Sequence, residues 1–509
     1  MINQRNIDTG RSSRRSARSA AITLLGRCAR PSVALITLGL SACSVGPHLT
    51  LAPAAAPDHY TRTPTGGATT PHQAFDWTAA QNAAWWQMFH STVLNALIAK
   101  SFAQNPTLAA ARDALTASNN YAVAQRGAFF PSIGLGGGLQ RDTALRSIVG
   151  GRVVVPGKPF TLAAASGEIS YNTDVFGLEG DLYRNARARA AVSAAAVQEA
   201  KIFLAGNVAT AAIALAGDQA ELQLRRQIVA AQTQVLGVMT SDYRFGSISD
   251  ESVQQQKSVL AANKAALPLI TARRDDARHR LNYLIGQAPD QPIPHLSMQD
   301  LIVPSAIPVV VPSVLVEHRP DIVAAMAAVT AASAAVDAST AAMYPNITLS
   351  GSFGAGSAAA LFNPVSEIFT LASSFAAPLF EGGTLSADKR AAYATWQQTT
   401  AQYKNTVLLA FNQVADGLRD LQGAEASLEQ RKAAADFAGT ALRIARKRYD
   451  AGAITYQTLL NAELLAQSDQ VAELTEQVTC YQDLVTLFVA MGDTPPSASP
   501  ATVKVTRTP

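Results

Sequence analysis

Charged residues are scarce in this chain of 509 residues. Asp, Glu, Lys and Arg together make up 15% of it, well below the roughly 25% of a typical soluble domain. Aromatic residues reach only 6%, although hydrophobic residues amount to 48%. The apolar share is therefore mostly alanine, a composition that argues against most ordinary soluble domains.

Cysteine and histidine are also rare, and they do not occur in reactive patterns. Three cysteines cannot supply a disulfide framework, and the seven histidines include no HExxH pair. Residues 151–158 superficially resemble a phosphate-binding loop, but the spacing is one residue too long and Pro159 replaces the hydroxyl residue that would reach magnesium. No Gly-x-Ser-x-Gly elbow is present. We therefore expect no enzymatic activity, no cofactor and no metal site.

Residues 1–42 have the pattern of a secretory signal peptide. Seven arginines and one acid precede the apolar stretch 31–40, which is followed by Ser41-Ala42-Cys43. Leu40-Ser41-Ala42-Cys43 also resembles the lipobox of bacterial lipoproteins, in which the cysteine carries the lipid. The alternative is ordinary cleavage that leaves Cys43 free. Because Ser44 follows instead of aspartate, this resemblance implies delivery to the outer membrane.

The basic character of the whole chain comes from this leader. The full sequence has a net charge of +4, but without residues 1–42 it has 34 basic and 36 acidic residues and a net charge of −2. An argument for a nucleic-acid partner from charge therefore fails.

The rest of the chain contains two copies of one repeat. Single matches of this kind arise by chance, but an ordered series indicates a tandem duplication. The matched segments are 105–107 with 319–321 and 130–133 with 344–347 at an offset of 214, 175–177 with 379–381 at 204, and 243–246 with 449–452 at 206.

Each copy is predicted to form a helix, two strands, a long helix and a return helix. The strand segments alternate apolar and polar residues, which gives each strand one apolar face. A water-soluble sheet with that face inward would have the same pattern. Four strands leave two open edges, and a sheet that spans a membrane must close with about eight strands or more. If the strands span a membrane, several chains must share one barrel. The alternating apolar residues are Ile133, Leu135, Leu139, Ile169, Tyr171, Val175, Ile347, Leu349, Phe353, Phe369, Leu371, Phe375 and Leu379.

The long helices are predicted from proline-free segments with heptad spacing. About 65 residues from Glu179 to Tyr243 would form a helix on the order of 95 Å long. Sustained spacing of three and four residues favours helices packed as coiled coils. Gly246 and Gly452 stand where each long helix gives way to its return helix, so both hairpin tips should lie far from the sheet. The seam residues are Leu204, Val208, Ala211, Leu215, Leu222 and Val229, then Val407, Phe411, Val414, Leu418 and Leu421, and then Leu464, Val471, Leu474, Val478, Tyr481, Val485 and Phe488.

Residues 301–316 connect the two copies. Pro304, Pro308 and Pro312 occur every fourth residue of this apolar run, and each proline removes a helical hydrogen bond. The segment is therefore predicted to be an extended connector and not a transmembrane helix.

Several motifs together resemble the outer-membrane efflux duct family, the TolC-like proteins, in its lipoprotein branch that serves resistance–nodulation–division pumps. The resemblance covers about residues 43–493. Each motif is weak alone, but their order and duplication are specific. The motifs are Cys43-Ser44-Val45-Gly46-Pro47, Trp85-Trp86-Gln87-Met88-Phe89, Asn105-Pro106-Thr107-Leu108, Arg319-Pro320-Asp321-Ile322, Tyr344-Pro345-Asn346-Ile347, Pro378-Leu379-Phe380-Glu381-Gly382-Gly383, and Tyr449, Gly452, Tyr456, Leu459 and Leu460.

This resemblance implies an α+β membrane protein that is a homotrimer. Three chains would give four strands each to a twelve-stranded β-barrel, which continues into a long periplasmic α-helical barrel. The chain would be lipid-anchored in the outer membrane of a Gram-negative bacterium and would contact outer-membrane lipid. It would act as a passive exit duct for drugs or other small toxic compounds, with a periplasmic adaptor protein and an inner-membrane resistance–nodulation–division pump as partners.

The resemblance also implies functional positions. The adaptor contacts fall on the tips, at Arg244, Gly246, Ala451 and Gly452, although a helical hairpin needs a glycine there in any case. The periplasmic gate falls on Gln457, Asn461 and Leu464. The family commonly has an acid at the position of Asn461 and often a basic residue at that of Leu464, so this chain departs from the usual charged gate. Asn461 is otherwise a solvated helix position.

The expected organisation follows from these assignments. It is a signal peptide at 1–42, a lipidated segment with Cys43 at 43–80, a first repeat at 81–300, the connector at 301–316, a second repeat at 317–493, and a tail at 494–509. Two alternatives stay open. One is an outer-membrane duct for type I protein secretion, and the other is a structural coiled-coil lipoprotein without a channel.

Overall fold

A computed structural model describes residues 45–51, 56–61, 68–70, 73–77, 84–142, 147–149, 152–154, 160–357 and 366–492. The chain divides into two compact units. The first contains Arg126–Asp181 and Asp337–Lys389, and the second contains His48–Gln125, Leu182–Val336 and the residues from Arg390 onward. The predicted lipid site Cys43 lies outside the described residues.

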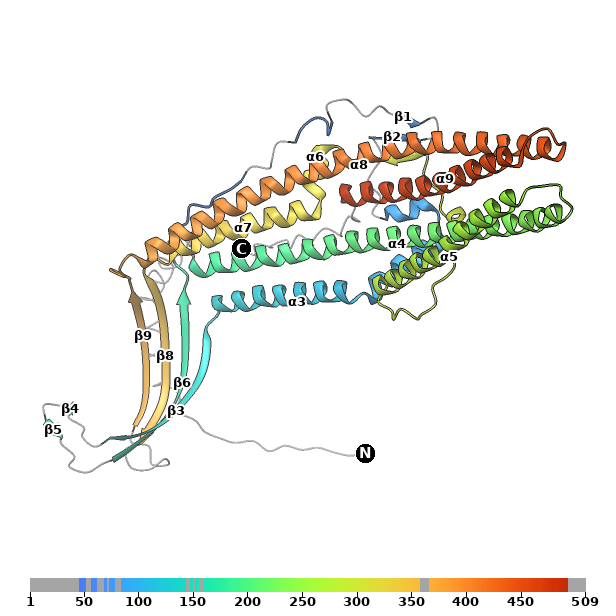
Figure 1. Cartoon of the computed structure of the whole chain (residues 1–509). Helices are drawn as coiled ribbons and strands as arrows, with labels where there is room; N and C mark the ends of the chain where they lie inside the picture. Colours follow the sequence, from blue (N-terminus) through green and yellow to red (C-terminus); the bar gives the residue numbers. More distant parts are fainter. Residues whose placement is uncertain are drawn as a thin grey trace, which may run out of the picture. The chain divides into compact units, whose positions relative to one another are not determined.

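The two halves of the chain have the same order of elements, which confirms the predicted repeat (Figure 1). In each half two helices precede two long strands, and a 67-residue helix is followed by a return helix. The first half consists of α2 Thr92–Gln104, α3 Pro106–Arg126, β3 Ser132–Asp142, β6 Phe160–Thr173, α4 Leu178–Arg244 and α5 Asp250–Leu284. The second consists of α6 Pro312–His318, α7 Pro320–Ala341, β8 Asn346–Ser357, β9 Ser366–Ala376, α8 Thr384–Asp450 and α9 Tyr456–Met491.

The four long strands form one antiparallel sheet in the order β3-β6-β8-β9 (Figure 1). Each strand therefore comes next to its partner from the same repeat, and β6 joins β8 across the two repeats. β6 and β9 end earlier than the sequence pattern predicts, at Thr173 and Ala376. Val175 and Leu379, predicted to extend the alternation, lie in the turns that lead into α4 and α8, because both halves need a turn before the long helix begins.

The sequence did not predict several short strands and turns that the structure contains. β1 Ala68–Thr70, β2 Gln73–Asp76 and β7 Ala306–Pro308 form a three-stranded sheet, in which Phe75 pairs with Ile307 and both are buried. β4 Ser147–Val149 pairs with β5 Arg152–Val154, and both belong to the segment of the chain that connects β3 to β6. Short 3-10 turns occur at η1 Trp85–Phe89, η2 Gly127–Phe129 and η3 Met298–Asp300.

The reading of residues 301–316 as wholly extended is correct only for the first part of that segment. β7 is extended, but α6 begins at Pro312. Proline is compatible with the first turn of a helix, because an N–H at that position has no partner within the helix. The proline that suggested an interruption therefore starts a helix.

The predicted coiled-coil seams correspond largely to the buried core of the second unit. Val208, Leu215, Val414 and Leu418 are fully or almost fully buried. Three assignments need correction. Val471 is only half-buried and does not belong to the buried cluster. Ile228 is buried where Val229 was predicted, because straight helices of 3.6 residues per turn drift from a strict heptad. Leu464 is 39% exposed, and its neighbours Leu460 and Ala466 are buried instead.

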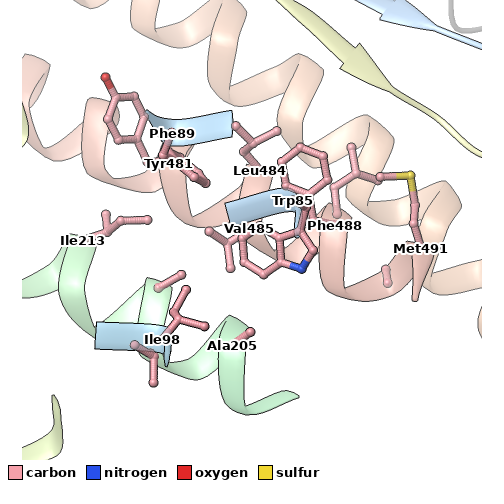
Figure 2. Packing of buried hydrophobic residues seen from close by; sticks show 14 of the residues in the cluster. Trp85, Phe89, Ile98, Ala205, Ile213, Tyr481, Leu484, Val485, Phe488 and Met491 are labelled. Atoms are coloured by element: carbon pink, nitrogen blue, oxygen red, sulfur yellow. The ribbon is translucent and has the colours of Figure 1, made fainter. Parts of the chain in front are cut away.

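Trp85 occupies the centre of that core (Figure 2). Its side chain is fully buried and stacks on Phe488 of α9, with ring centroids 5.4 Å apart. Phe89 contacts the same cluster through its edge-to-face pair with Trp85 at 6.5 Å. The Trp-Trp-Gln-Met-Phe motif thus anchors η1 between the helices of both repeats.

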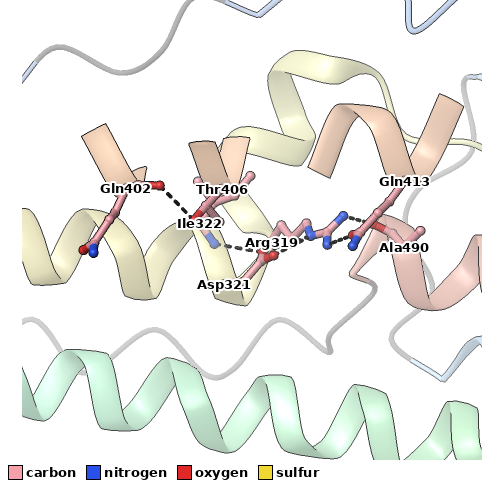
Figure 3. Close-up of polar contacts among 7 residues, drawn as sticks. All are labelled: Arg319, Asp321, Ile322, Gln402, Thr406, Gln413 and Ala490. Carbon is pink, nitrogen blue, oxygen red and sulfur yellow. Dashed lines mark hydrogen bonds and ion pairs between the residues drawn. The ribbon is translucent and has the colours of Figure 1, made fainter. Parts of the chain in front are cut away.

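The matched residues Asn105 and Arg319 have equivalent structural roles, and Figure 3 shows the contacts of Arg319. Asn105 Nδ2 donates to the Leu284 carbonyl at 2.8 Å, near the end of α5. Arg319 Nη1 donates to the Ala490 carbonyl at 2.5 Å, near the end of α9. Each residue ties the helix junction at the start of its repeat to the last turn of its return helix. The repeat motif therefore links the start of each repeat to the end of the same repeat.

The thiol of Cys480 is expected to resist modification in the folded protein. Its side chain is 4% exposed, and burial, reinforced by the nearby Glu425, raises the pKa of the thiol to about 12. At pH 8 almost none of it is the reactive thiolate. Maleimide labelling followed by mass spectrometry should modify Cys480 in denaturant but not in native protein, and equal labelling in both states would contradict this packing.

Candidate functional site

Directly paired residues of neighbouring strands project on the same face of a sheet, so the register sorts the side chains into two faces. One face carries large apolar side chains that are exposed. Leu135, Phe353 and Phe369 share one row with Gly167, and they are 91%, 59% and 71% exposed. The next row holds Ile133, Ile169, Gly351 and Leu371. Such a face needs an apolar medium, so the water-soluble sheet with its apolar face inward is excluded.

The opposite face is built mostly from small and polar residues. It has the expected composition of a surface that borders water inside a barrel. Its rows are Ser132, Ser170, Ser350 and Ala372, then Gly134, Glu168, Ser352 and Thr370, and then Gly136, Ser166, Gly354 and Ile368.

The strands are long enough to cross a membrane. β3 and β9 have 11 residues each, which span roughly 36 Å at about 3.3 Å per residue. With the usual tilt of barrel strands this length crosses a hydrocarbon layer of about 30 Å. β3 and β9 form the two edges of the four-stranded sheet, and open edges do not occur within hydrocarbon. Because β3 and β9 run in opposite directions, an edge of one chain can pair antiparallel with the other edge of the next.

Aromatic residues gather at the end of the sheet where the strands join the helices. Phe130 and Tyr344 precede β3 and β8, whereas Phe176 and Phe380 follow β6 and β9. The rings of Phe176 and Tyr344 stack with their centroids 5.2 Å apart, and Phe130 and Phe380 are exposed. Aromatic girdles occupy the membrane–water interface of barrel proteins. The duplicated Phe-Pro and Tyr-Pro motifs therefore mark one edge of the apolar layer.

The two hairpin tips have the same backbone structure. Gly246 and Gly452 have φ angles of 76° and 70°, which favour glycine. The amide of Ser247 donates to the Asp242 carbonyl at 2.9 Å, and in the second repeat Ala453 donates to Arg448 at 2.8 Å. This is the Schellman pattern of a helix end. The predicted left-handed turns are confirmed.

Both tips expose the residues that were predicted to contact an adaptor. Arg244, Gly246, Ala451 and Gly452 are all exposed. Phe245, beside Gly246, is 83% exposed. Ser249 and Thr455 then cap the return helices, with their side chains accepting from the amides of Ser252 and Thr458. The two tips thus present matched surfaces with different side chains.

The three predicted gate residues lie on one face of α9. Gln457, Asn461 and Leu464 follow the spacing of one helix face, and all three are exposed. Gln457 Nε2 donates to Asn461 Oδ1 at 3.1 Å. The structure thus brings these residues together as one uncharged surface.

A buried network of polar side chains lies next to this surface, and the sequence did not predict it. The Tyr456 hydroxyl donates to Gln256 Oε1 at 2.6 Å, and Gln256 Nε2 donates to the Gln232 carbonyl at 3.2 Å. Gln232 in turn donates to Gln467 at 3.1 Å and accepts from Asn263 at 3.1 Å. Burial, together with the nearby Glu463, raises the pKa of Tyr456. The network joins α9 of the second hairpin to both helices of the first.

These features define a class of protein. A sheet with one face for lipid and one for water, two unpaired edges and long helical hairpins belongs to a membrane channel that several chains build together. Among the described residues, no group of three or more His, Cys, Asp or Glu could hold a metal ion.

Comparison with known proteins identifies the family. The model of the family described as outer membrane efflux protein matches residues 97–287 and 311–493, one segment for each repeat. The chain belongs to this family, which is one of channels and not of enzymes. Its membership confirms the predicted outer-membrane location.

Two relatives show the degree of similarity in sequence. The chain is 28% identical over 421 residues to the pyoverdine export outer membrane protein OpmQ of Pseudomonas putida. The aligned region covers 81% of this chain and 88% of the relative. It is 29% identical over 338 residues to the outer membrane protein OprJ of Pseudomonas aeruginosa. That aligned region covers 63% of this chain and 68% of the relative.

Solved structures show the same fold. The outer-membrane channel OprN has a TM-score of 0.78 at 23% identity and covers 89% of this chain and 100% of its own. The outer membrane protein VceC of Vibrio cholerae has a TM-score of 0.75 at 25% identity. The match covers 81% of this chain and 99% of the VceC chain. The predicted fold class, a trimeric twelve-stranded barrel continued by a helical barrel, is confirmed.

Proposed function

We propose that this chain is the exit duct of a tripartite efflux system. Three copies form the outer-membrane channel, a periplasmic adaptor protein binds the hairpin tips, and an inner-membrane resistance–nodulation–division pump supplies the energy. The observation that carries the proposal is the family match over both repeats, supported by a sheet with one lipid-type and one water-type face. The duct is passive and has no catalytic role.

Small organic compounds are the proposed substrates. Relatives are named for the export of pyoverdine and for the efflux of solvents and toluene in Pseudomonas. A duct for type I protein secretion would need the same architecture, but these names favour small compounds. A coiled-coil lipoprotein without a channel does not account for the exposed apolar face of the sheet.

The proposed function is tested by deletion and complementation. A strain that lacks this gene should accumulate a fluorescent efflux dye, and the full chain should restore export. Purified trimers should also conduct ions across a planar bilayer. Restored export of a secreted protein but not of the dye would favour the secretion alternative, and a monomer released from membranes by mild salt would exclude the duct.

The hairpin tips are the proposed adaptor surface. Arg244, Gly246, Ala451 and Gly452 are exposed on matched turns, and the exposed ring of Phe245 offers an apolar contact. Photo-crosslinkers placed at Arg244 or Ala451 should capture one periplasmic adaptor, identified by mass spectrometry. A crosslinker at the exposed Phe437, which belongs to α8 but not to a tip, should not capture it.

The proposed periplasmic gate consists of Gln457, Asn461 and Leu464. These side chains are uncharged, so closure depends on amide and apolar contacts and should respond little to pH or salt. Glu463 directly precedes Leu464 on α9, but it is buried and pairs with Arg446 at 3.1 Å. Because both partners belong to the same hairpin, breaking that pair does not separate one chain from another.

Bilayer conductance tests this uncharged gate. After correction for bulk conductivity, the conductance of the wild type should change by less than about twofold between pH 5 and pH 8 and between low and high salt, because no charged pair holds the aperture closed. Asn461→Asp should make conductance depend on pH, since three carboxylates then approach each other. A steep rise in wild-type conductance as ion pairs are broken would contradict the assignment.

We also propose that residues 43–80 are tethered through a lipid on Cys43 and that the remaining boundaries follow the sequence prediction. Close packing supports a defined path for the start of this segment. A Cβ atom on Gly46 would collide with the Asp337 side chain, so the Cys-Ser-Val-Gly-Pro motif needs glycine there. Mass spectrometry of the purified N-terminus should detect acylation of Cys43, and an unmodified cysteine would contradict the tether.

A further inference from the structure

We infer that Glu168 makes the barrel lumen selective for cations, so that the duct passes cationic and zwitterionic compounds more readily than anionic ones. This inference rests on the proposed function, because it needs three chains to close one barrel. Three copies of Glu168 then form a ring of carboxylates at one depth of the lumen. Rings of acidic side chains give channels a preference for cations.

The register places Glu168 on the face that borders water. Glu168 pairs with Gly134 of β3 and with Ser352 of β8, and Ser352 pairs in turn with Thr370 of β9. This row lies on the opposite face from the row of Leu135 and Phe353, whose side chains are exposed and apolar. Glu168 is itself exposed. Its carboxylate therefore projects into the lumen and not toward lipid.

No basic residue lies in the rows around Glu168. Among the described residues that face the lumen with it, the neighbouring positions are glycine, serine, threonine, alanine, asparagine and isoleucine. The other ionisable residues of these strands are Arg141, Asp142, Tyr171 and Glu367. Arg141, Asp142 and Glu367 occur near the end of the sheet away from the helices, and Tyr171 falls in a row of the apolar face. Glu168 has neither a hydrogen bond nor an ion pair with another described residue.

The surroundings also leave the carboxylate uncovered. A Cβ atom added to Gly134, the partner of Glu168, would meet nothing within 4 Å. Exposed glutamates are negatively charged at neutral pH. Glu168 lies five residues before the end of β6 at Thr173, roughly 17 Å from the helix end of the sheet. The charge thus belongs to the membrane-spanning part of the lumen.

The test measures local charge, because the conductance of the whole duct also depends on the aperture. Ser170→Cys places a thiol on the lumen face, two residues from Glu168 on the same strand. The variant is made in the exported protein with Cys480→Ala. Because Cys28 belongs to the predicted signal peptide at residues 1–42, the proposed lipid-bearing Cys43 is then the remaining other cysteine. Heat-sensitive trimers are reacted with a cationic and an anionic methanethiosulfonate of similar size, and the ratio of the two rates is compared with and without Glu168→Gln.

We expect the cationic reagent to react faster, and Glu168→Gln to lower the ratio of the two rates by roughly fivefold at low salt, as expected for a unit charge about 7 Å from the thiol. Most of this effect should disappear at about 0.5 M salt. Glu381→Gln is the matched control, since Glu381 lies in the turn after β9, and it should leave the ratio unchanged.

Two results would overturn the inference, and they have different meanings. If both reagents react but Glu168→Gln leaves the ratio unchanged, the channel stands and its charge selectivity does not depend on Glu168. If neither reagent reacts although trimers form, this face of the sheet does not border water. The proposed duct would then fail together with the inference.

Discussion

Replacing Leu371 by arginine is expected to prevent assembly of the protein in the outer membrane. Leu371 is 77% exposed and lies at the centre of β9, in the row with Ile133, Ile169 and Gly351. An arginine on the lipid face near the middle of a bilayer costs about 2–4 kcal/mol, so three copies would cost roughly 6–12 kcal/mol per trimer. The amount of heat-sensitive trimer in outer-membrane fractions measures the effect.

Thr370→Arg is the matched control for Leu371→Arg. Thr370 precedes Leu371 on the same strand, but its row on the opposite face contains Gly134, Glu168 and Ser352. An arginine there faces water and lies near an acid, so trimers should form at close to the wild-type level. Equal loss of both variants, or full recovery of both, would show that the two faces are not lipid and water.

Arg319→Met is expected to lower the free energy of unfolding by about 3–5 kcal/mol, because it breaks a buried charged network. Arg319 is only 7% exposed. Its Nε donates to Asp321 at 2.9 Å, Nη1 donates to the Ala490 carbonyl, and Nη2 donates to Gln413 (Figure 3). Methionine fills much of the volume but leaves the carboxylate and the carbonyl without this donor. The midpoint of guanidinium unfolding, followed by circular dichroism, measures the loss.

Arg443→Met provides the comparison for Arg319→Met. Arg443 is exposed on α8, and in the described part of the chain its side chain makes one hydrogen bond, a long one to Thr440 at 3.4 Å. Its replacement should therefore change stability by less than about 0.5 kcal/mol. If Arg319→Met unfolds at the same guanidinium concentration as Arg443→Met, the junction between α7 and the end of α9 does not stabilise the repeat as described.

The parts of the fold that sequence could predict depend on local periodicity. Alternation in β3 and β8 separates the apolar residues from the small polar ones over ten or more residues, so one face could be assigned without knowing the partner strand. Gly246 and Gly452 could be assigned to turns because the break in helical pattern and the glycine coincide. The matched offsets also made each half support the assignment of the other.

The parts that sequence could not predict depend on distant partners. Tyr456 and Gln256 are 200 residues apart, and neither has a local pattern that indicates a hydrogen bond. The role of Arg319 was hidden for a different reason. Its motif was visible, but the group that it holds is the backbone carbonyl of Ala490, and a carbonyl has no signature in sequence.

The candidate site was predictable to a similar degree. The spacing of Gln457, Asn461 and Leu464 shows that they share one face of a helix, and the structure exposes that face. Whether this face lines an aperture depends on neighbouring chains. Leu464 shows the limit of pattern alone, because heptad spacing assigned it to the seam although it is exposed.

The most direct test of the channel is whether β9 of one chain pairs with β3 of the next. A cysteine at Leu135 on β3, combined in turn with cysteines along β9 from Phe369 to Phe375 in a Cys480→Ala background, would report on this junction. Mild oxidation should give dimers and trimers linked by disulfides at one register and nothing larger. No linkage at any register, or a ladder that continues beyond three chains, would contradict a closed barrel of twelve strands.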